Sequence, residues 1–368
     1  MKHDLRKVCR QFRFAGEWLD GAPYGTGHIN DTYAIRQQTG AGVTRYILQR
    51  VNHKIFKDVP RLMANVQRVT DHIRGKLAVL PGHDPKRETL TVVPTRDGQS
   101  YHQDEDGNFW RSYLFIEGAK TYDEITSPRQ AFEAAKAFAN YQKMLMDLPG
   151  SRLHETIPDF HHTPKRFAAL ETAIGKDVAH RAAQAQPEIA FALARRPMTG
   201  TLIALLEKGA MPERVTHNDT KINNVMLDDK DGHGVCVIDL DTVMPGLALY
   251  DFGDEVRTTT CTGAEDEQDL GKAKFRLEMF AELVRGYLET GRGFLTPAEV
   301  DYLAFSGRLI TFEIGIRFLA DYLDGDVYFK THRPDHNLHR CRVQFERVRQ
   351  MEAAEDAMNQ VVARYRQG

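Results

Sequence analysis

Two short stretches of this chain carry acidic and amide side chains at a spacing suited to moving a phosphoryl group. Asn224 lies five positions after Asp219, and Asp239 ends the apolar run 235–238. Phosphoryl transfer needs a carboxylate that orients and deprotonates the attacking hydroxyl, and ligands that hold Mg²⁺ on the phosphates. We therefore predict that Asp219 is the base and that Asn224 and Asp239 are metal ligands.

Four neighbouring residues receive narrower predictions. Asp241 is either a further metal ligand or a solvated carboxylate at the end of a strand. Lys221 either neutralises the transferring phosphoryl group or is an ordinary surface lysine. His217 is expected to support the catalytic loop by packing and hydrogen bonding. Asp251 begins an Asp-Phe-Gly sequence, but no good strand precedes it, so we expect it to hold the catalytic loop through backbone N–H groups.

These motifs resemble those of the aminoglycoside-phosphotransferase-type kinase superfamily, and more closely those of the N-acetylhexosamine 1-kinases. The segments that carry the resemblance are Gly25–Tyr33, His217–Val225, Val237–Asp254 and Ile314–Phe329, in the same order along nearly the whole chain. The resemblance implies an α+β, two-lobed protein-kinase-like fold that uses ATP and Mg²⁺. It also implies that Arg317 and Tyr328 reach the hydroxyls of a sugar.

The glycine-rich turn at Gly25 and Gly27 precedes a β-rich run and suits a lid over nucleotide phosphates, because glycine lets backbone N–H groups approach anions closely. His28 and Asp31 flank this turn. His28 either packs at the start of a strand or points toward the γ-phosphate or the sugar, and the resemblance favours the second position. We assign His28 to both nucleotide and substrate binding, and Asp31 to substrate binding.

One position departs from the usual kinase pattern. Kinases carry a Lys on the second strand of this hairpin, paired with a Glu on the next helix. This chain has Gln49 followed by Arg50, and the predicted helix 60–77 contains no Glu. Gln49 would supply a neutral hydrogen bond to the nucleotide site, so another cation or the metal must carry the charge.

The domain boundary is predicted at the end of an apolar strand, 109–116. Glu117-Gly118 breaks this strand and is typical of the hinge between kinase lobes, where the backbone could read the adenine edge. We therefore expect a β-rich nucleotide-binding lobe over 1–116 and a mainly helical lobe over 117–368. The helical lobe would contain the catalytic loop and the sugar pocket.

Several further elements are expected from local patterns. They are a strand at 89–95, helices at 128–145, 158–174, 271–288 and 336–367, a capping box at 296–299, and a β-prone loop at 258–263. His161 and His162 resemble a metal pair only superficially, and we expect solvated loop residues. Glu313 and Arg317 form either a helix-surface salt bridge or, in the case of Arg317, part of the sugar pocket.

The composition of the chain indicates which class of protein it belongs to. The chain has 368 residues, 42% hydrophobic and 27% charged, which is typical of a globular protein. A formal net charge of −2 provides no attraction to nucleic acid or to an anionic membrane. Four scattered cysteines suit a reducing compartment, and neither a membrane span nor a secretory signal is expected. We expect a cytoplasmic monomer or weak homodimer whose partners are ATP and a small amino sugar.

The predicted function is phosphorylation of the anomeric O1 hydroxyl of N-acetylglucosamine or N-acetylgalactosamine by ATP. A near alternative is a kinase for another small alcohol, such as an aminoglycoside, choline, homoserine or a modified ribose. Arg317 disfavours a cationic substrate. A third alternative is a nucleotide-binding pseudokinase scaffold, which the missing Lys–Glu pair favours and the complete Asp219, Asn224 and Asp239 set opposes.

Overall fold

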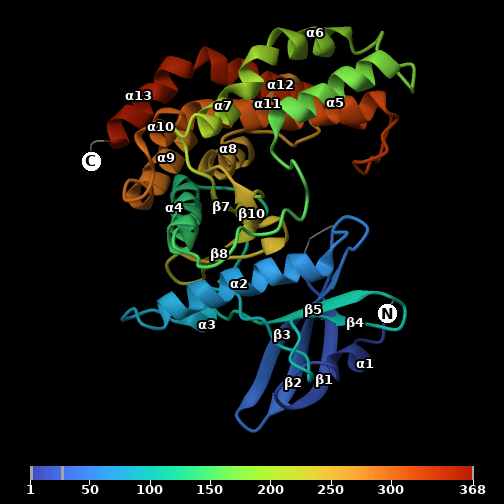
Figure 1. The fold of residues 1–368 in the computed structure, drawn as a ribbon, viewed down its shortest axis with the longest axis vertical. Coiled ribbons are helices and arrows are strands. Elements are labelled where there is room, and N and C mark those ends of the chain that lie inside the picture. The colour runs from blue at the N-terminus through green and yellow to red at the C-terminus, as the bar shows by residue number, and fades with distance from the viewer. Residues whose placement is uncertain (1–2, 26–28, 367–368) are drawn as a thin grey trace. The chain divides into compact units, whose positions relative to one another are not determined.

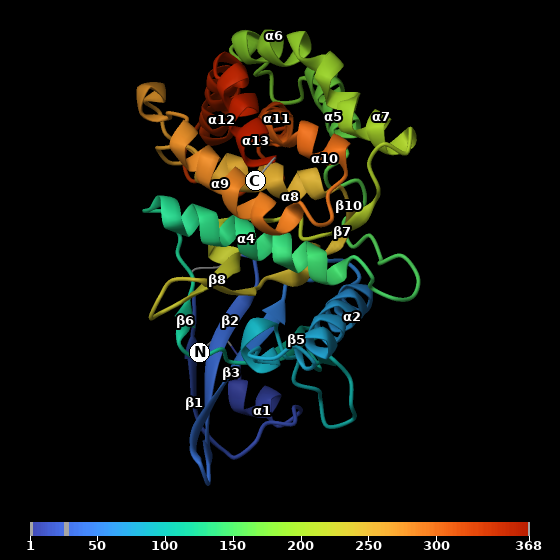
Figure 2. The same ribbon diagram turned by 90° about the vertical axis from the view of Figure 1, so that its left-hand side faces the viewer.

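The structure is a computed structural model that describes residues 3–25 and 29–366. The chain forms two compact units. The first unit contains residues 1–120, 144–158 and 226–244, and the second contains 121–143, 159–225 and 245–368. Residues 144–158 and 226–244 come after position 117 in the sequence but belong to the first unit. No single boundary in the chain therefore separates the two units. Figures 1 and 2 show the elements of each unit.

The first unit is built on a five-stranded sheet in the order β1-β2-β3-β5-β4. Buried and less buried residues alternate along β2, as expected of a strand with one face in a core. The tight β2–β3 turn is a two-residue loop, since Thr39 pairs with Gly42. The elements of this unit are α1 (Leu5–Cys9), β1 (Glu17–Pro23), β2 (Asp31–Thr39), β3 (Gly42–Val51), α2 (Val59–Leu77), α3 (Pro85–Glu88), β4 (His102–Gln103), β5 (Phe109–Leu114), β6 (Ala119–Lys120), β8 (Val225–Asp228), β9 (Gly234–Val237) and the 3₁₀ turn η3 (Leu240–Thr242).

The apolar face of the sheet packs against helix α1. Leu5, Val8 and Cys9 of the helix share a core with Ile35 and Trp110 of the sheet. Helix α2 begins at a side-chain cap from Asp58 and buries one face of apolar residues. The predicted helix 60–77 is thereby confirmed.

The second unit is helical, and α11 lies at its centre. Helices α5, α8 and α12 all pack against α11 (Figure 1). Two glycines permit this, because a Cβ at Gly307 would lie 2.5 Å from Val256 and one at Gly315 would lie 2.6 Å from Phe345. The elements are α4 (Pro128–Leu145), α5 (Thr163–Lys176), α6 (Gln186–Ala194), η1 (Arg196–Gly200), α7 (Thr201–Glu207), β7 (Arg214–Thr216), η2 (Ile222–Asn224), β10 (Met244–Gly246), α8 (Ala248–Thr259), η4 (Leu270–Lys272), α9 (Leu277–Gly291), α10 (Pro297–Asp301), α11 (Leu303–Leu323), α12 (His336–Ala353) and α13 (Glu355–Arg366).

Local patterns predicted most helices, and three predictions need correction. The expected strand 89–95 makes only isolated bridges, such as Val92 to Tyr113. The long helix 336–367 is two helices, because the chain leaves helical geometry at Ala354 and α13 turns back along α9 (Figure 2). The stretch 258–263 begins as the last turn of α8. The capping box at Thr296 and Glu299 is confirmed.

Within the described residues, no single helix is both long and apolar enough to cross a membrane. One bent pair, Gln186–Ala194 with Arg196–Glu207, passes a test of length and composition at an angle of 51°.

Candidate functional site

The loop of the second unit that was predicted to be catalytic places two polar side chains, those of Asn224 and Lys221, around the Asp219 carboxylate. Asn224 donates from Nδ2 to the Asp219 main-chain oxygen at 2.7 Å and to its Oδ2 at 3.0 Å. The Lys221 ammonium lies 3.0 Å from the same Oδ2. The loop reaches this geometry partly because Asn218 adopts a left-handed conformation with φ 65°. Asn tolerates that conformation better than most residues.

The Asp219 carboxylate is held in its charged form. Desolvation in the loop opposes ionisation, but the positive charge of Lys221, followed by the electrostatic interaction with His217, outweighs it and lowers the pKa of Asp219 below its ordinary value. The hydrogen bonds from Lys221 and Asn224 act in the same direction. A carboxylate that stays ionised at neutral pH can accept a proton from a bound hydroxyl.

Asp251 fixes the backbone of this loop from helix α8. Its carboxylate oxygens accept the N–H groups of His217 at 2.9 Å and Asn218 at 2.7 Å, and the Gln142 side-chain amide at 2.6 Å. The predicted role of Asp251 as a structural anchor is confirmed. Burial raises the pKa of Asp251, and the electrostatic interaction with His217 and these hydrogen bonds oppose that rise.

The next turn of α8 adds a second anchor. The Thr220 N–H donates to Asp254 Oδ2 at 3.0 Å, and the Thr220 hydroxyl donates to the Asp251 carbonyl at 2.6 Å. Arg257 in turn bonds Asp254 at 2.7 Å. One face of a single helix therefore fixes three residues of the loop, His217, Asn218 and Thr220.

His217 supports the loop from within the core, as predicted. It has 0% exposure and meets the rings of Phe138 and Tyr141 edge-on. Its Nδ1 accepts the Asp219 N–H at 3.3 Å. The imidazole thus links the apolar core to the backbone of the proposed base.

The expectation of a solvated loop residue is wrong for His161 and holds for His162, which lies in the loop before α5 and is partly exposed. His161 is buried, and its two ring nitrogens contact Glu313 at 2.8 Å and the Asn218 carbonyl at 3.2 Å. Glu313 also accepts the Thr163 hydroxyl at 2.6 Å. His162 caps helix α5. Sequence reasoning missed this third anchor because its partners lie on distant elements.

Arg317 and Tyr328 lie in one aromatic cluster of the second unit. The Arg317 guanidinium carbon lies 5.5 Å from the Phe160 ring centroid, 6.0 Å from Tyr328 and 5.6 Å from Phe329. Glu313 bonds His161 and Thr163 in place of the expected surface salt bridge to Arg317. The side chain of Tyr328 is open to solvent, with 64% of the residue exposed. The pair predicted for the sugar is therefore brought together.

In the first unit, Asp239 and Asp241 follow strand β9 in different environments. Asp239 adopts a left-handed conformation with φ 58° at the start of η3. Asp241 is buried, so the solvated alternative is wrong. Its Oδ1 forms an ion pair with Arg111, and its Oδ2 accepts the Asn30 amide at 2.7 Å.

The residues of the predicted hairpin point to opposite faces, as the alternation requires. Gln49 bonds Thr32 and Arg111 at 3.0 Å each. Arg50 pairs with Asp31 at 2.7 Å on the other face. Asp31, predicted to bind substrate, therefore already has an ion-pair partner in the first unit.

The remaining nucleotide-side predictions fall on the glycine turn and the hinge. Gly25 has φ 79°, which favours glycine, and a side chain there would meet open space. Gly27 and His28 lie outside the described residues. The Glu117 side chain pairs with Arg45, and its carbonyl accepts Arg87 at 3.2 Å. A role of Glu117 toward adenine would therefore fall to its backbone N–H.

The donor chemistry of the predicted metal ligands fits a hard divalent cation. Carboxylate and amide oxygens are the ligands that Mg²⁺ prefers. The amide nitrogen of Asn224 is committed to Asp219, which leaves its oxygen directed to other partners. A different group, Asp228, Asp231 and His233, also brings its ligand atoms within 4.8 Å of one another in the described chain. Asp228 there bonds Arg87 and two turn N–H groups, as expected of an ordinary hairpin turn.

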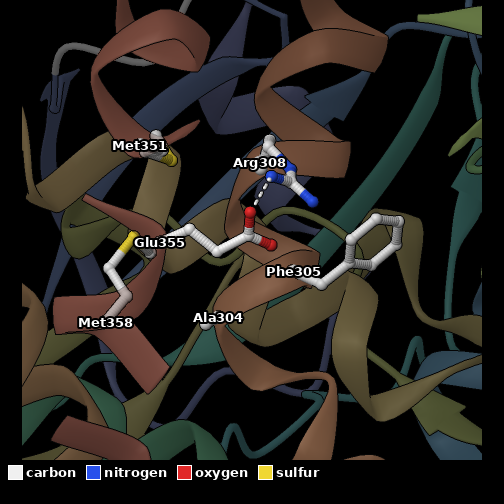
Figure 3. Close-up of a pocket in the computed structure, with 6 residues that line it drawn as sticks. All are labelled: Ala304, Phe305, Arg308, Met351, Glu355 and Met358. Atoms are coloured by element: carbon white, nitrogen blue, oxygen red, sulfur yellow. Dashed lines mark ion pairs between the residues drawn. The ribbon is translucent and has the colours of Figure 1, made fainter. Parts of the chain in front are cut away.

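A small hollow of the second unit lies elsewhere, among α11, α12 and α13. An ion pair between Arg308 and Glu355 at 3.0 Å closes one side of it (Figure 3). Ala304, Phe305, Met351 and Met358 supply the rest of its lining. None of the predicted site residues lines this hollow, and its two charged side chains pair with each other.

Comparison with known proteins finds a matching family model and solved structures with a similar fold. Residues 20–287 match the family model described as the phosphotransferase enzyme family. A microcompartment-associated aminopropanol kinase has a similar structure, with TM-score 0.56 and 15% identity over 96% of this chain and 98% of that one. Spectinomycin phosphotransferase in complex with ADP and spectinomycin is also similar, with TM-score 0.54 and 13% identity over 95% and 97%. Plasmodium vivax ethanolamine kinase has TM-score 0.53 and 12% identity over 88% and 82%. The predicted α+β kinase-like fold is confirmed.

Proposed function

The chain belongs to the phosphotransferase enzyme family, and from this premise we propose that it transfers the γ-phosphoryl group of ATP to O1 of an N-acetylhexosamine. The observation that carries the reaction is the state of Asp219. Its carboxylate is ionised beside Lys221, fixed by Asn224, and carried on a backbone that helix α8 and His161 hold. Such rigidity is what a base needs to orient a bound hydroxyl.

The proposed step needs one proton transfer and one exchange of bonds at phosphorus. Asp219 accepts the proton of the sugar hydroxyl as the sugar oxygen bonds to the γ-phosphorus, and the bond from that phosphorus to the bridging oxygen of ADP breaks. A weak base suffices, because the ring oxygen makes the anomeric hydroxyl more acidic than other sugar hydroxyls. Lys221 is placed to follow the developing negative charge.

We propose Asn224, Asp239 and Asp241 as the residues that hold Mg²⁺. When bound there, the metal would supply the positive charge that neutralises the phosphates. We further propose that Gly25, Gly27, Gln49 and Glu117 face the nucleotide. His28 and Asp31 are proposed to face the acceptor.

The choice of a neutral sugar rests on the Arg317 cluster. Among the described residues, no hydrogen bond or ion pair is assigned to the Arg317 guanidinium, which can therefore bond two hydroxyls of a ligand. Burial, followed by the positive charge of Arg317, lowers the pKa of Arg166. This local positive field disfavours ammonium substrates, although aminopropanol and ethanolamine appear in the names of two structural relatives.

An ADP-release assay with a panel of acceptors tests the proposal. The panel contains N-acetylglucosamine, N-acetylgalactosamine, glucose, galactose, kanamycin, choline and aminopropanol, each with and without Mg²⁺. We expect turnover with at least one N-acetylhexosamine, and ³¹P NMR of the product should show phosphate coupled to the anomeric proton.

Two outcomes would contradict the proposal in different ways. Turnover confined to the amino alcohols or kanamycin would support the alternative kinase reaction. ATP binding without turnover on any acceptor would support the scaffold alternative.

A further inference from the structure

The cation missing from strand β3 is present on the neighbouring strand. In the register of β3 and β5, Gln49 stands directly opposite Arg111. Gln49 occupies the position where kinases carry a Lys. Its side-chain oxygen accepts the Arg111 Nε–H at 3.0 Å. Arg111 is a lone charge within the apolar run Phe109–Leu114, which was the sequence signal that could have identified it.

Arg111 is buried, with 1% exposure, and its charge is fully partnered. Its Nη1 forms the ion pair with Asp241, and its guanidinium lies 5.4 Å from the Tyr113 ring centroid. Burying a charge is costly unless an opposite charge and hydrogen bonds compensate it. Breaking this pair would therefore leave an uncompensated charge in the core of the first unit.

The pair belongs to a chain of contacts that reaches the end of the glycine-rich turn. Asn30 donates to Asp241 Oδ2 at 2.7 Å and accepts the Asn52 N–H at 2.9 Å. Gln49 continues the chain on the other side by donating to Thr32 at 3.0 Å. Turn, sheet and the η3 segment are thus joined through one buried arginine.

The ion pair also restrains the segment that carries Asp239. Asp239 precedes η3 and Asp241 lies within it, so the contact that fixes Asp241 to the sheet also limits the movement of Asp239. Both carboxylates are proposed metal ligands.

We propose that the Arg111–Asp241 pair replaces the Lys–Glu pair of other kinases. Arg111 fixes the segment that carries Asp239 to the sheet and supplies the permanent positive charge on the nucleotide-phosphate side of the first unit. Arg111 is a positioning residue, because it acts on the nucleotide and the metal through Asp241 and Asp239. This inference rests on the proposed function for the identity of the ligand as an Mg²⁺–nucleotide complex.

The experiment that tests this proposal removes the positive charge from strand β5 and introduces a positive charge on strand β3. Arg111→Met removes the charge, Arg111→Met with Gln49→Lys restores a cation at the usual position, and Arg111→Met with Gln49→Met is the matched uncharged control. The readouts are the Kd of ADP at several Mg²⁺ concentrations by calorimetry, KM for ATP, kcat and thermal unfolding.

We expect Arg111→Met to weaken Mg²⁺-dependent ADP binding at least about tenfold, because a buried partner charge is lost. KM for the sugar should change less than about threefold. Gln49→Lys should recover most of the loss in ADP binding, whereas Gln49→Met should recover none. Arg111→Lys, which keeps the charge but not the planar fork, should fall between wild type and Arg111→Met.

Equal recovery by Gln49→Lys and Gln49→Met would overturn the inference, since it would show that packing alone matters. Unchanged Mg²⁺-dependent binding in folded Arg111→Met would also overturn it. If Arg111→Met does not fold, Arg111→Lys, which keeps the charge but loses the contacts of the planar fork, must show a weaker loss of the same Mg²⁺-linked kind. The binding measurement needs no acceptor, so failure of the sugar assay and failure of this inference remain distinguishable.

Discussion

Two turns of the second unit are held by the same device but differ in exposure. Asp251 accepts N–H groups of the catalytic loop, and Asp321 accepts the N–H groups of Val327, Tyr328 and Phe329. His217 on the first turn is fully buried, whereas Tyr328 on the second is 64% exposed. Each turn has a backbone fixed by one buried carboxylate.

The difference lies in what holds the side chains. The catalytic loop receives further anchors from Asp254 and His161, and its central residues pack into the core. The backbone of the turn at 327–329 is supported further through Asn337, which bonds Asp321 at 2.8 Å, and its aromatic side chains contact Arg317. A reacting group needs fixed geometry, whereas a recognition residue needs an open side chain on a fixed backbone. The comparison therefore predicts that damage to the first turn affects kcat and damage to the second affects KM.

The largest expected effect is that of Asp219→Asn. The substitution keeps the size of the side chain but removes the charge that Lys221 and Asn224 contact. We expect kcat to fall about 10²–10⁴-fold, the range for loss of a general base. ADP binding by calorimetry should change little. A folded variant that retains kcat within about tenfold of wild type would exclude Asp219 as the base.

Asp251→Asn should have the next largest effect. An amide can replace only one of the two acceptor oxygens, so a buried N–H of the loop loses its partner at about 1–3 kcal/mol. We expect the Tm to fall by about 5 °C and kcat by about 10–100-fold. Differential scanning fluorimetry measures the Tm, and the ADP-release assay measures kcat. Loss of stability without loss of kcat would break the proposed link between loop rigidity and turnover.

Asp321→Ala tests the second turn. Three backbone N–H groups lose their acceptor, so Tyr328 should lose its fixed position. We expect KM for the sugar to rise about tenfold and kcat to change less than about threefold. The matched control is Asp324→Ala, an exposed residue of the same segment that should leave both values unchanged. A fall in kcat with unchanged KM would contradict the prediction that this turn affects sugar binding and not the rate of reaction.

The smallest effect concerns a buried carboxyl behind the catalytic loop. Glu255 is 1% exposed, and neither of its oxygens has a hydrogen-bond partner among the described residues. Burial, followed by the charges of Asp251 and Asp254, raises the pKa of Glu255 well above its ordinary value. The folded state therefore holds a proton that the unfolded state releases, and stability falls as pH rises above the ordinary value toward the folded pKa.

Glu255→Gln removes this ionisation. We expect the Tm of the variant to gain about 2 °C relative to wild type between pH 5 and pH 8, with the gain increasing toward pH 8. Thermal unfolding of both proteins across that pH range measures the difference in Tm. An unchanged kcat at pH 7 serves as the control that the substitution leaves the catalytic loop intact. A difference in Tm that is constant with pH would show that Glu255 does not titrate in this range.

The sequence by itself determined the reaction class and the helical layout. Asp219, Asn224 and Asp239 are recognisable because their spacing within short segments is characteristic, and apolar periodicity located helices such as α2. The structural role of Asp251 was also predictable, since no strand precedes it.

Only the tertiary structure decided which residues support that chemistry. His161 bonds a carbonyl 57 positions away, and Arg111 pairs with a carboxylate 130 positions away. Local sequence patterns do not indicate which distant residues will become partners. A buried charge or imidazole is stable only where folding brings a complementary group to it, so its role follows from burial and contact and not from spacing along the chain.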